Sequence, residues 1–206
     1  MRRFTALSIL FLITLAGPSL AACGDAAIQE SATPPPADVT WVDALGHTVH
    51  FNQPPQRIAI AGKSALTVAD AAFMFPEARE RVVALGQARQ NVADFLRYVD
   101  PTLDQKMLLE VEAGAEQIAA AQPDAVILKS YMAQSLGTTL EELGMPVVYV
   151  DLETPEQYLR DIETLGLLFG NPARAGEIRA FFQSRLERVS ASLQELDETQ
   201  KPRVLM

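Results

Sequence analysis

The chain has 206 residues, enough for one α/β domain with extensions, and 49% of them are hydrophobic, as in globular proteins. Its 17 basic and 26 acidic side chains give a formal net charge of −9. That balance argues against a nucleic-acid partner and against binding of the folded domain to an anionic membrane, because both need clustered positive charge.

The first 22 residues are expected to be a signal peptide. Two arginines precede an apolar stretch from Phe4 to Ala16 that is too short to make a comfortable transmembrane helix. The sequence LAAC, which ends at Cys23, resembles the bacterial lipobox, and that resemblance implies cleavage before Cys23 and a thioether-linked diacylglycerol on its sulfur. An ordinary signal peptide cut near Ala22, which leaves a free thiol, is the alternative. Cys23 is the single cysteine, so an intramolecular disulfide is excluded, and in either case the mature protein is expected to work outside the cytoplasmic membrane.

A tether and a β-hairpin are expected next. Residues 23–38 lack an apolar period and contain the run Pro34–Pro36, which is typical of a partly extended linker. The alternating stretch from Val39 to Phe51 predicts a hairpin. It holds the only two histidines, His47 and His50, which point to opposite faces if both lie on a strand. We therefore interpret them as surface or structural residues and not as metal ligands.

A strand from Arg57 to Ala61 and a helix from Ala65 to Phe75 are predicted to flank the tripeptide GKS. This arrangement invites comparison with a nucleotide-binding phosphate loop, but the first glycine of that motif is missing. In one interpretation the tripeptide only makes a sharp turn and starts the helix. In the other, Lys63 and Ser64 face a ligand cleft, where the free N–H groups of the helix start favour an anionic group.

The second predicted strand runs from Val82 to Leu85. The following stretch, from Gly86 to Glu112, is long and less regular, with a short helix expected from Asn91 to Val99. Arg89 follows the strand end closely. It either reaches the same cleft or is a surface arginine.

The stretch from Glu116 to Asp151 predicts a helix, a strand, a second helix and a second strand. Ala125–Leu128 and Val147–Val150 are short apolar runs typical of buried strands, and proline or glycine ends the helix before each of them. Two strands joined by a helix of this length form a parallel unit with both faces covered. In such sheets ligands bind beyond the carboxyl ends of the strands. Those ends carry Lys129, Ser130, Tyr131 and Asp151.

Two helices are predicted to follow. The first, Pro155–Gly170, begins after Thr154 as a plausible cap. The second, from Ala173 to about Leu196, would be about 36 Å long, which is more than this small domain needs. Its apolar stripe consists of Ile178, Phe181, Phe182, Leu186, Val189 and Leu193. The strand-like segment Arg203–Met206 is interpreted as the first strand of a further lobe in a longer chain, with a final edge strand of this domain as the alternative.

Four stretches in a fixed order carry a family resemblance. They are the hairpin with Asp43 and Gly46, PPQRIAI (Pro54–Ile60), GAEQIAAAQPDAVIL (Gly114–Leu128) and LGMPVVYVD (Leu143–Asp151). With the lipobox and the long helix, residues 39–206 resemble the amino-terminal lobe and connecting helix of a helical-backbone (class III) substrate-binding protein of a bacterial ABC importer. That class handles iron–siderophore complexes, haem, cobalamin and, in a separate branch, free metal ions.

The resemblance implies an α/β fold, a Rossmann-like parallel-sheet lobe with flanking helices over residues 39–153, preceded on the chain by the tether. Residues 154–200 would be a helical pair that includes the inter-lobe backbone helix, and residues 201–206 would start a second lobe that is missing. The resemblance also implies that one acidic residue on each lobe docks to arginines of the permease. Here that residue is Glu116, although a glutamate at a helix start is by itself only favourable to the helix dipole.

The leading hypothesis is a lipid-anchored receptor, not an enzyme, that captures a metal chelate and delivers it to a permease and its ATPase. A ferric siderophore is the favoured chelate, with haem and corrinoids as others, and no cofactor or bare-metal site is expected because the histidines are too few. Cationic groups suit an anionic chelate, and Tyr131 can stack on a flat one. With haem, Tyr131 or Met132 could contact the metal or ring, although Met132 fits packing better. The ligand-binding candidates are Lys63, Ser64, Arg89, Lys129, Ser130 and Tyr131.

Two alternatives remain open. An exported α/β enzyme lacks support because the sequence has no G-x-S-x-G motif, no paired histidine and acid, and no metal-binding cluster. An interaction module, in which this lobe alone is an assembly unit, is the other.

Overall fold

The computed structural model of the protein describes residues 38–87, 93–194 and 196–197. Five of the sequence-based expectations therefore lie outside the described residues. These are the signal peptide, the lipid-bearing Cys23, nearly all of the tether, the cleft candidate Arg89 and the strand-like end at residues 201–206.

A five-stranded sheet forms the centre of the described chain, and every neighbouring pair of strands in it is parallel. The strand order is β5-β4-β3-β6-β7. The strands are β3 (Ile58–Ile60), β4 (Val82–Gly86), β5 (Met107–Leu109), β6 (Ala125–Lys129) and β7 (Val147–Val150). The four expected strands are confirmed, and the α/β fold with them. The fifth, β5, was missed because it is three residues long and has two half-exposed apolar residues at an edge of the sheet.

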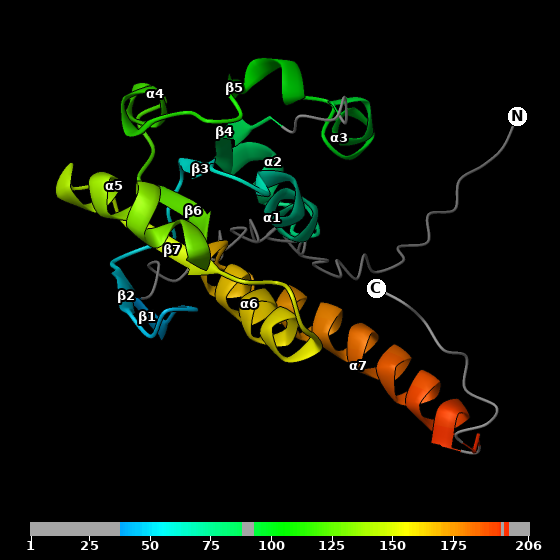
Figure 1. Cartoon of the computed structure of the whole chain (residues 1–206). Coiled ribbons are helices and arrows are strands. Elements are labelled where there is room, and N and C mark those ends of the chain that lie inside the picture. Colours follow the sequence, from blue (N-terminus) through cyan, green and yellow to red (C-terminus); the bar gives the residue numbers. More distant parts are fainter. Residues whose placement is uncertain (1–37, 88–92, 195, 198–206) are drawn as a thin grey trace, which may run out of the picture. The chain divides into compact units, whose positions relative to one another are not determined.

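Helices cover both faces of the sheet because alternate strand residues point to opposite sides. Ile58, Ile127 and Val148 pack against α1 (Ala65–Ala72) and α6 (Pro155–Leu168) in one core. Val126, Leu128 and other residues one position away pack in a second core. That core contains α4 (Ala115–Ala120), the one-turn η2 (Ser130–Met132), the π-helical turn η3 (Ala133–Gly137) and α5 (Thr138–Glu142). Figure 1 shows these two layers on opposite sides of the sheet.

The expected hairpin is present as β1 (Val39–Val42) and β2 (Thr48–Phe51), and its turn docks on β7. The backbone N–H of Ala44 donates to the Tyr149 carbonyl at 3.1 Å. The buried Asp43 carboxylate accepts hydrogen bonds from Leu45 N and His47 N, each at 2.9 Å. Asp43 thus holds the turn together while the turn covers the otherwise open edge of the sheet.

Three short helices connect the remaining strands. They are α2 (Ala78–Arg81), the 3₁₀ turn η1 (Leu103–Gln105) and α3 (Ala93–Val99), where a short helix was expected. An ion pair of 2.6 Å between Arg97 and Asp104 joins α3 to η1. Helix α1 ends three residues before the predicted Phe75, since the chain turns there toward Pro76.

The last two helices are confirmed nearly as predicted. Thr154 and Gln157 form a capping box that begins α6, with Pro155 in its first turn. Helix α7 (Pro172–Gln194) approaches α6 closely at Gly166, where an added Cβ would lie 2.5 Å from the Cβ of Ala175.

Helix α7 leaves most of its predicted apolar stripe uncovered. Only Ala175 and Ile178 of this helix are buried, whereas Phe181, Val189 and Leu193 are 48–60% exposed. The helix therefore extends beyond the core that anchors its first turns (Figure 1). Within the described part of the chain, no helix combines the length and apolarity needed to cross a membrane.

Candidate functional site

The topology places a crevice between β3 and β6. The chain runs outward from β3 to β4 and β5, and then returns to β6 and β7 on the other side of β3. The segments that leave β3 and β6 go to opposite faces, with α1 on one side and η3 on the other. This is a topological switch point, the usual ligand position in open parallel sheets.

Two loops border the switch point, and a tyrosine bridges them. Tyr131 is the middle residue of η2. Its hydroxyl lies 3.0 Å from the Ser64 hydroxyl and 3.2 Å from the Lys63 carbonyl. Gly62 and Ser64 have positive φ angles of 76° and 61°, a conformation that turns the chain sharply from β3 into α1. Tyr131 is 56% exposed, so its hydroxyl is held in place while much of the side chain stays open to solvent.

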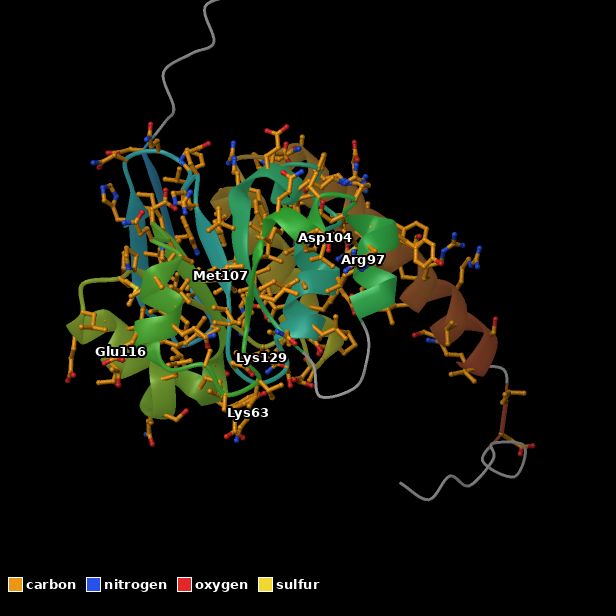
Figure 2. The ribbon with its side chains drawn as sticks, turned by 90° about the horizontal axis from the view of Figure 1, so that it is seen from above. Lys63, Arg97, Asp104, Met107, Glu116 and Lys129 are labelled. Carbon is orange, nitrogen blue, oxygen red and sulfur yellow. The ribbon has the colours of Figure 1, made fainter. Side chains whose placement is uncertain are left out.

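Lys63, beside this tyrosine, is exposed to solvent. Its ammonium group has no partner among the described residues. Figure 2 shows Lys63 and Lys129 at the same end of the sheet. The two lysines differ in environment, because Lys129 is almost completely buried.

The Lys129 side chain is only 1% exposed. Its ammonium group donates to the Asp151 carbonyl and to a carboxylate oxygen of Glu153. A buried ammonium needs such partners, since leaving it unpaired costs several kcal/mol by the usual order of magnitude (about 3–5). Lys129, one of the ligand-binding candidates from the sequence, is therefore paired within the fold.

Asp151 is the centre of a second set of contacts after β7. Ser130 donates to one of its oxygens, and Arg160 of α6 lies 2.6 Å from the other. Burial raises the pKa of Asp151, but the hydrogen bonds from Ser130 and Arg160 outweigh it and hold the pKa below its ordinary value. The buried Asp161 accepts from the N–H groups of Asp151 and Leu152 at 2.6 and 2.8 Å, which fixes the turn into α6.

A small cavity of about 230 Å³ adjoins the switch point. Its polar walls include Lys63, Glu112 and Ser135, and the Met132 side chain forms part of its apolar wall. Met132 is buried in the second core and meets Gly62, which supports packing as its main role.

A larger cavity, of about 570 Å³, lies at the other end of the sheet. Two of its three cations, Arg57 and Lys106, serve the fold, whereas Arg79 is exposed. Arg57 donates to the carbonyls of Ala121 and Gln122, at the end of α4, at 2.6–2.8 Å. Lys106 donates to two carbonyls and pairs with the buried Asp100 at 3.2 Å. We therefore assign the functional site to the switch point despite its smaller volume.

Among the described residues, Glu116 and the hairpin histidines form no hydrogen bond or ion pair with the groups at the switch point. Glu116 is exposed in the first turn of α4. His50 bonds Thr40 and Asn52 within and beside the hairpin, at 3.0 and 3.1 Å. In the described ranges no three histidine, cysteine or acidic side chains gather as a metal site.

The structure thus brings together Lys63, Ser64 and Tyr131, with Ser130 and Lys129 in the adjoining polar set. Sequence reasoning missed Glu153 and Arg160. Glu153 directly precedes the cap of α6, and Arg160 lies in that helix. They reach Lys129 at the end of β6 and Asp151 after β7 only because α6 packs beside these strands. No local sequence signal marks them.

The family described as periplasmic binding protein matches residues 59–206. A search of curated proteins found no match.

Solved structures share the fold. The TroA-like periplasmic binding protein FepB from Veillonella parvula is 21% identical with a TM-score of 0.66, over 80% of this chain and 51% of that one. The molybdate periplasmic binding protein MolA from Haemophilus influenzae is 16% identical, with a TM-score of 0.65 and coverages of 81% and 57%. The siderophore-binding protein BauB is 20% identical, with a TM-score of 0.58 and coverages of 79% and 56%. The chain thus spans about half the length of the solved structures that it matches.

Proposed function

The chain belongs to the periplasmic binding protein family, and from that premise we propose that it is the solute-binding component of an ABC importer. It binds a metal chelate, a ferric siderophore above all, at the switch point between β3 and β6. It then delivers the chelate to a permease served by an ATPase, without catalysing a reaction.

One observation carries the proposal. The Tyr131 hydroxyl contacts the β3–α1 loop, while more than half of the residue stays exposed beside the switch point of a parallel sheet. A largely exposed aromatic ring has no packing role to explain it. It provides a surface on which a flat catecholate, an aromatic chelator or a porphyrin can stack.

The charges around Tyr131 suit an anionic or strongly polar ligand. Lys63 has an ammonium group without a partner among the described residues, and Ser64 and Ser130 supply hydroxyl groups. Arg89, which follows β4, is a further candidate from the sequence.

Three of the similar structures are described with metal-containing ligands. BauB is bound to a complex between two molecules of acinetobactin and ferric iron, and MolA is bound to molybdate. A periplasmic haem-binding protein from Pseudomonas aeruginosa has the same fold. These ligands favour a metal-containing anion or chelate and leave the choice among them to binding experiments.

Two attachments complete the proposal. We propose that Cys23 carries a lipid that anchors the protein on the outer side of the cytoplasmic membrane, and that Glu116 docks to a basic residue of the permease. Cys23→Ser should move the protein from the membrane fraction to the soluble fraction. Glu116→Gln should weaken binding to the permease but leave chelate affinity unchanged.

Isothermal titration with a panel of ferric siderophores, haem, a corrinoid and molybdate tests the function. We expect one ferric siderophore to bind, and Tyr131→Ala to weaken it about tenfold through loss of stacking. Tyr131→Phe keeps the ring and loses only the hydroxyl contacts to Ser64 and to the Lys63 carbonyl, so it should have a smaller effect. No binding across the panel would overturn the proposed function.

A further inference from the structure

Lys129 and Glu153 form an ion pair whose two members differ sharply in exposure. The Lys129 side chain is 1% exposed and fixed on β6, whereas the Glu153 side chain is 64% exposed. Glu153 lies on the turn between β7 and α6, one residue before the Thr154 cap. The buried charge of Lys129 therefore needs the pair for its stabilisation, whereas the Glu153 carboxylate is already mostly hydrated.

This asymmetry makes Glu153 replaceable. Removal of an anion from a buried ammonium is costly unless another anion takes its place. Release of the Glu153 carboxylate into water costs little, because that side chain is already mostly hydrated. The free-energy change should therefore be small when a different anionic oxygen replaces Glu153 on Lys129.

We propose that Glu153 occupies the position of an anionic ligand oxygen and is displaced when the ligand binds. This inference rests on the proposed function, and it names the substrate class. The site would prefer a chelate with peripheral carboxylate or catecholate oxygens to a neutral chelate of similar size, because only the former replaces the glutamate on Lys129.

The other charges near the pair are already balanced. Asp151 is held by Ser130 and Arg160, and Arg160 also contacts Asp161 at 2.8 Å. Among the described acidic groups near Lys129, Glu153 is therefore the one whose departure leaves no buried group other than Lys129 itself without its partner. Lys63, at the same end of the sheet (Figure 2), adds attraction for an incoming anion.

The test uses calorimetric titration of the chain with two probes, an anionic ferric tris-catecholate and a neutral ferric tris-hydroxamate. Glu153→Gln removes the competing charge. It should raise affinity for the anionic chelate roughly tenfold and change affinity for the neutral one less than about twofold. Glu156→Gln is the matched control, an identical change at an exposed position three residues away, and should alter neither.

Lys129→Met tests the other half of the pair. It should lower affinity for the anionic chelate about tenfold and spare the neutral one. The inference is overturned if Glu153→Gln weakens the anionic chelate, strengthens both chelates equally, or behaves like Glu156→Gln. If the unaltered chain binds neither chelate, the proposed siderophore function fails, and the inference fails with it.

Discussion

The two ends of the sheet both carry lysine and arginine, but the partners of these cations differ. At the amino end, Arg57 and Lys106 are bonded to main-chain carbonyls and to the buried Asp100. At the carboxyl end, Lys63 has no partner in the described part of the chain, and Lys129, which also donates to the Asp151 carbonyl, is paired with a carboxylate that is mostly in water. Cations held by main-chain carbonyls or buried acids alone stabilise the fold, whereas a cation that is open, or whose anionic partner is hydrated, can serve a ligand.

Exchange of each buried lysine for methionine gives the largest contrast between the ends. Lys106→Met leaves Asp100, which is 0% exposed, as an unpaired buried charge and should destabilise the protein by about 3–5 kcal/mol. Lys129→Met should cost less than about 1 kcal/mol, because Glu153 can be hydrated. Urea denaturation measures both. Equal losses would contradict the distinction between committed and replaceable pairs.

The dependence of the free energy of unfolding on acidic pH should reflect Asp100 at the amino end of the sheet and Asp151 at the carboxyl end. Burial raises the pKa values of Asp100 and Asp151, but hydrogen bonds and nearby cations lower them more, so each ends below its ordinary value near 3.8. A carboxyl group with a depressed pKa contributes stability that is complete above its unfolded pKa and is lost as pH falls through the folded one.

We therefore expect the free energy of unfolding to decline as pH drops below about 4 and on through the depressed pKa values. Asp151→Asn should reduce this decline and cost about 1–3 kcal/mol at neutral pH. Denaturant melts at several pH values provide the measurement. An unchanged acid slope in this variant would show that Asp151 is not held as described.

Substitution of Arg57 should lower the free energy of unfolding by a smaller amount and leave chelate affinity unchanged. Arg57→Met removes two charged hydrogen bonds to the carbonyls after α4 and should cost about 1–2 kcal/mol, given that the residue is partly solvated. Chelate affinity should stay the same, because Arg57 lies at the opposite end of the sheet from the switch point. A parallel loss of affinity in titration would place the ligand in the larger cavity instead.

Lys63 should show the reverse behaviour and the smallest change in stability. Lys63→Met removes a solvated charge, so the free energy of unfolding should move by no more than about 0.5 kcal/mol. Affinity for an anionic chelate should nevertheless fall several-fold, and the loss should shrink at high salt as screening increases. An unchanged affinity at low salt would remove Lys63 from the site.

The sequence alone was sufficient for the family and for most of the elements. Four strands, the hairpin, the capping box and the long helix follow from local apolar period, turn residues and caps, and the family match confirms the resemblance to solute-binding proteins. These features are local in the chain, so local patterns report them. The three-residue β5 and the one-turn α2 were missed because they are too short to carry a period.

Only the tertiary structure decided which polar groups are free. Lys63 and Lys129 look alike as lysines that follow apolar strands, yet one is exposed and the other is buried against Glu153. That difference arises from the packing of β7 and the start of α6 beside β6, over 20 residues further along the chain. The sequence pattern predicts where each strand ends. Which side chains meet at those ends depends on how distant segments of the chain pack together.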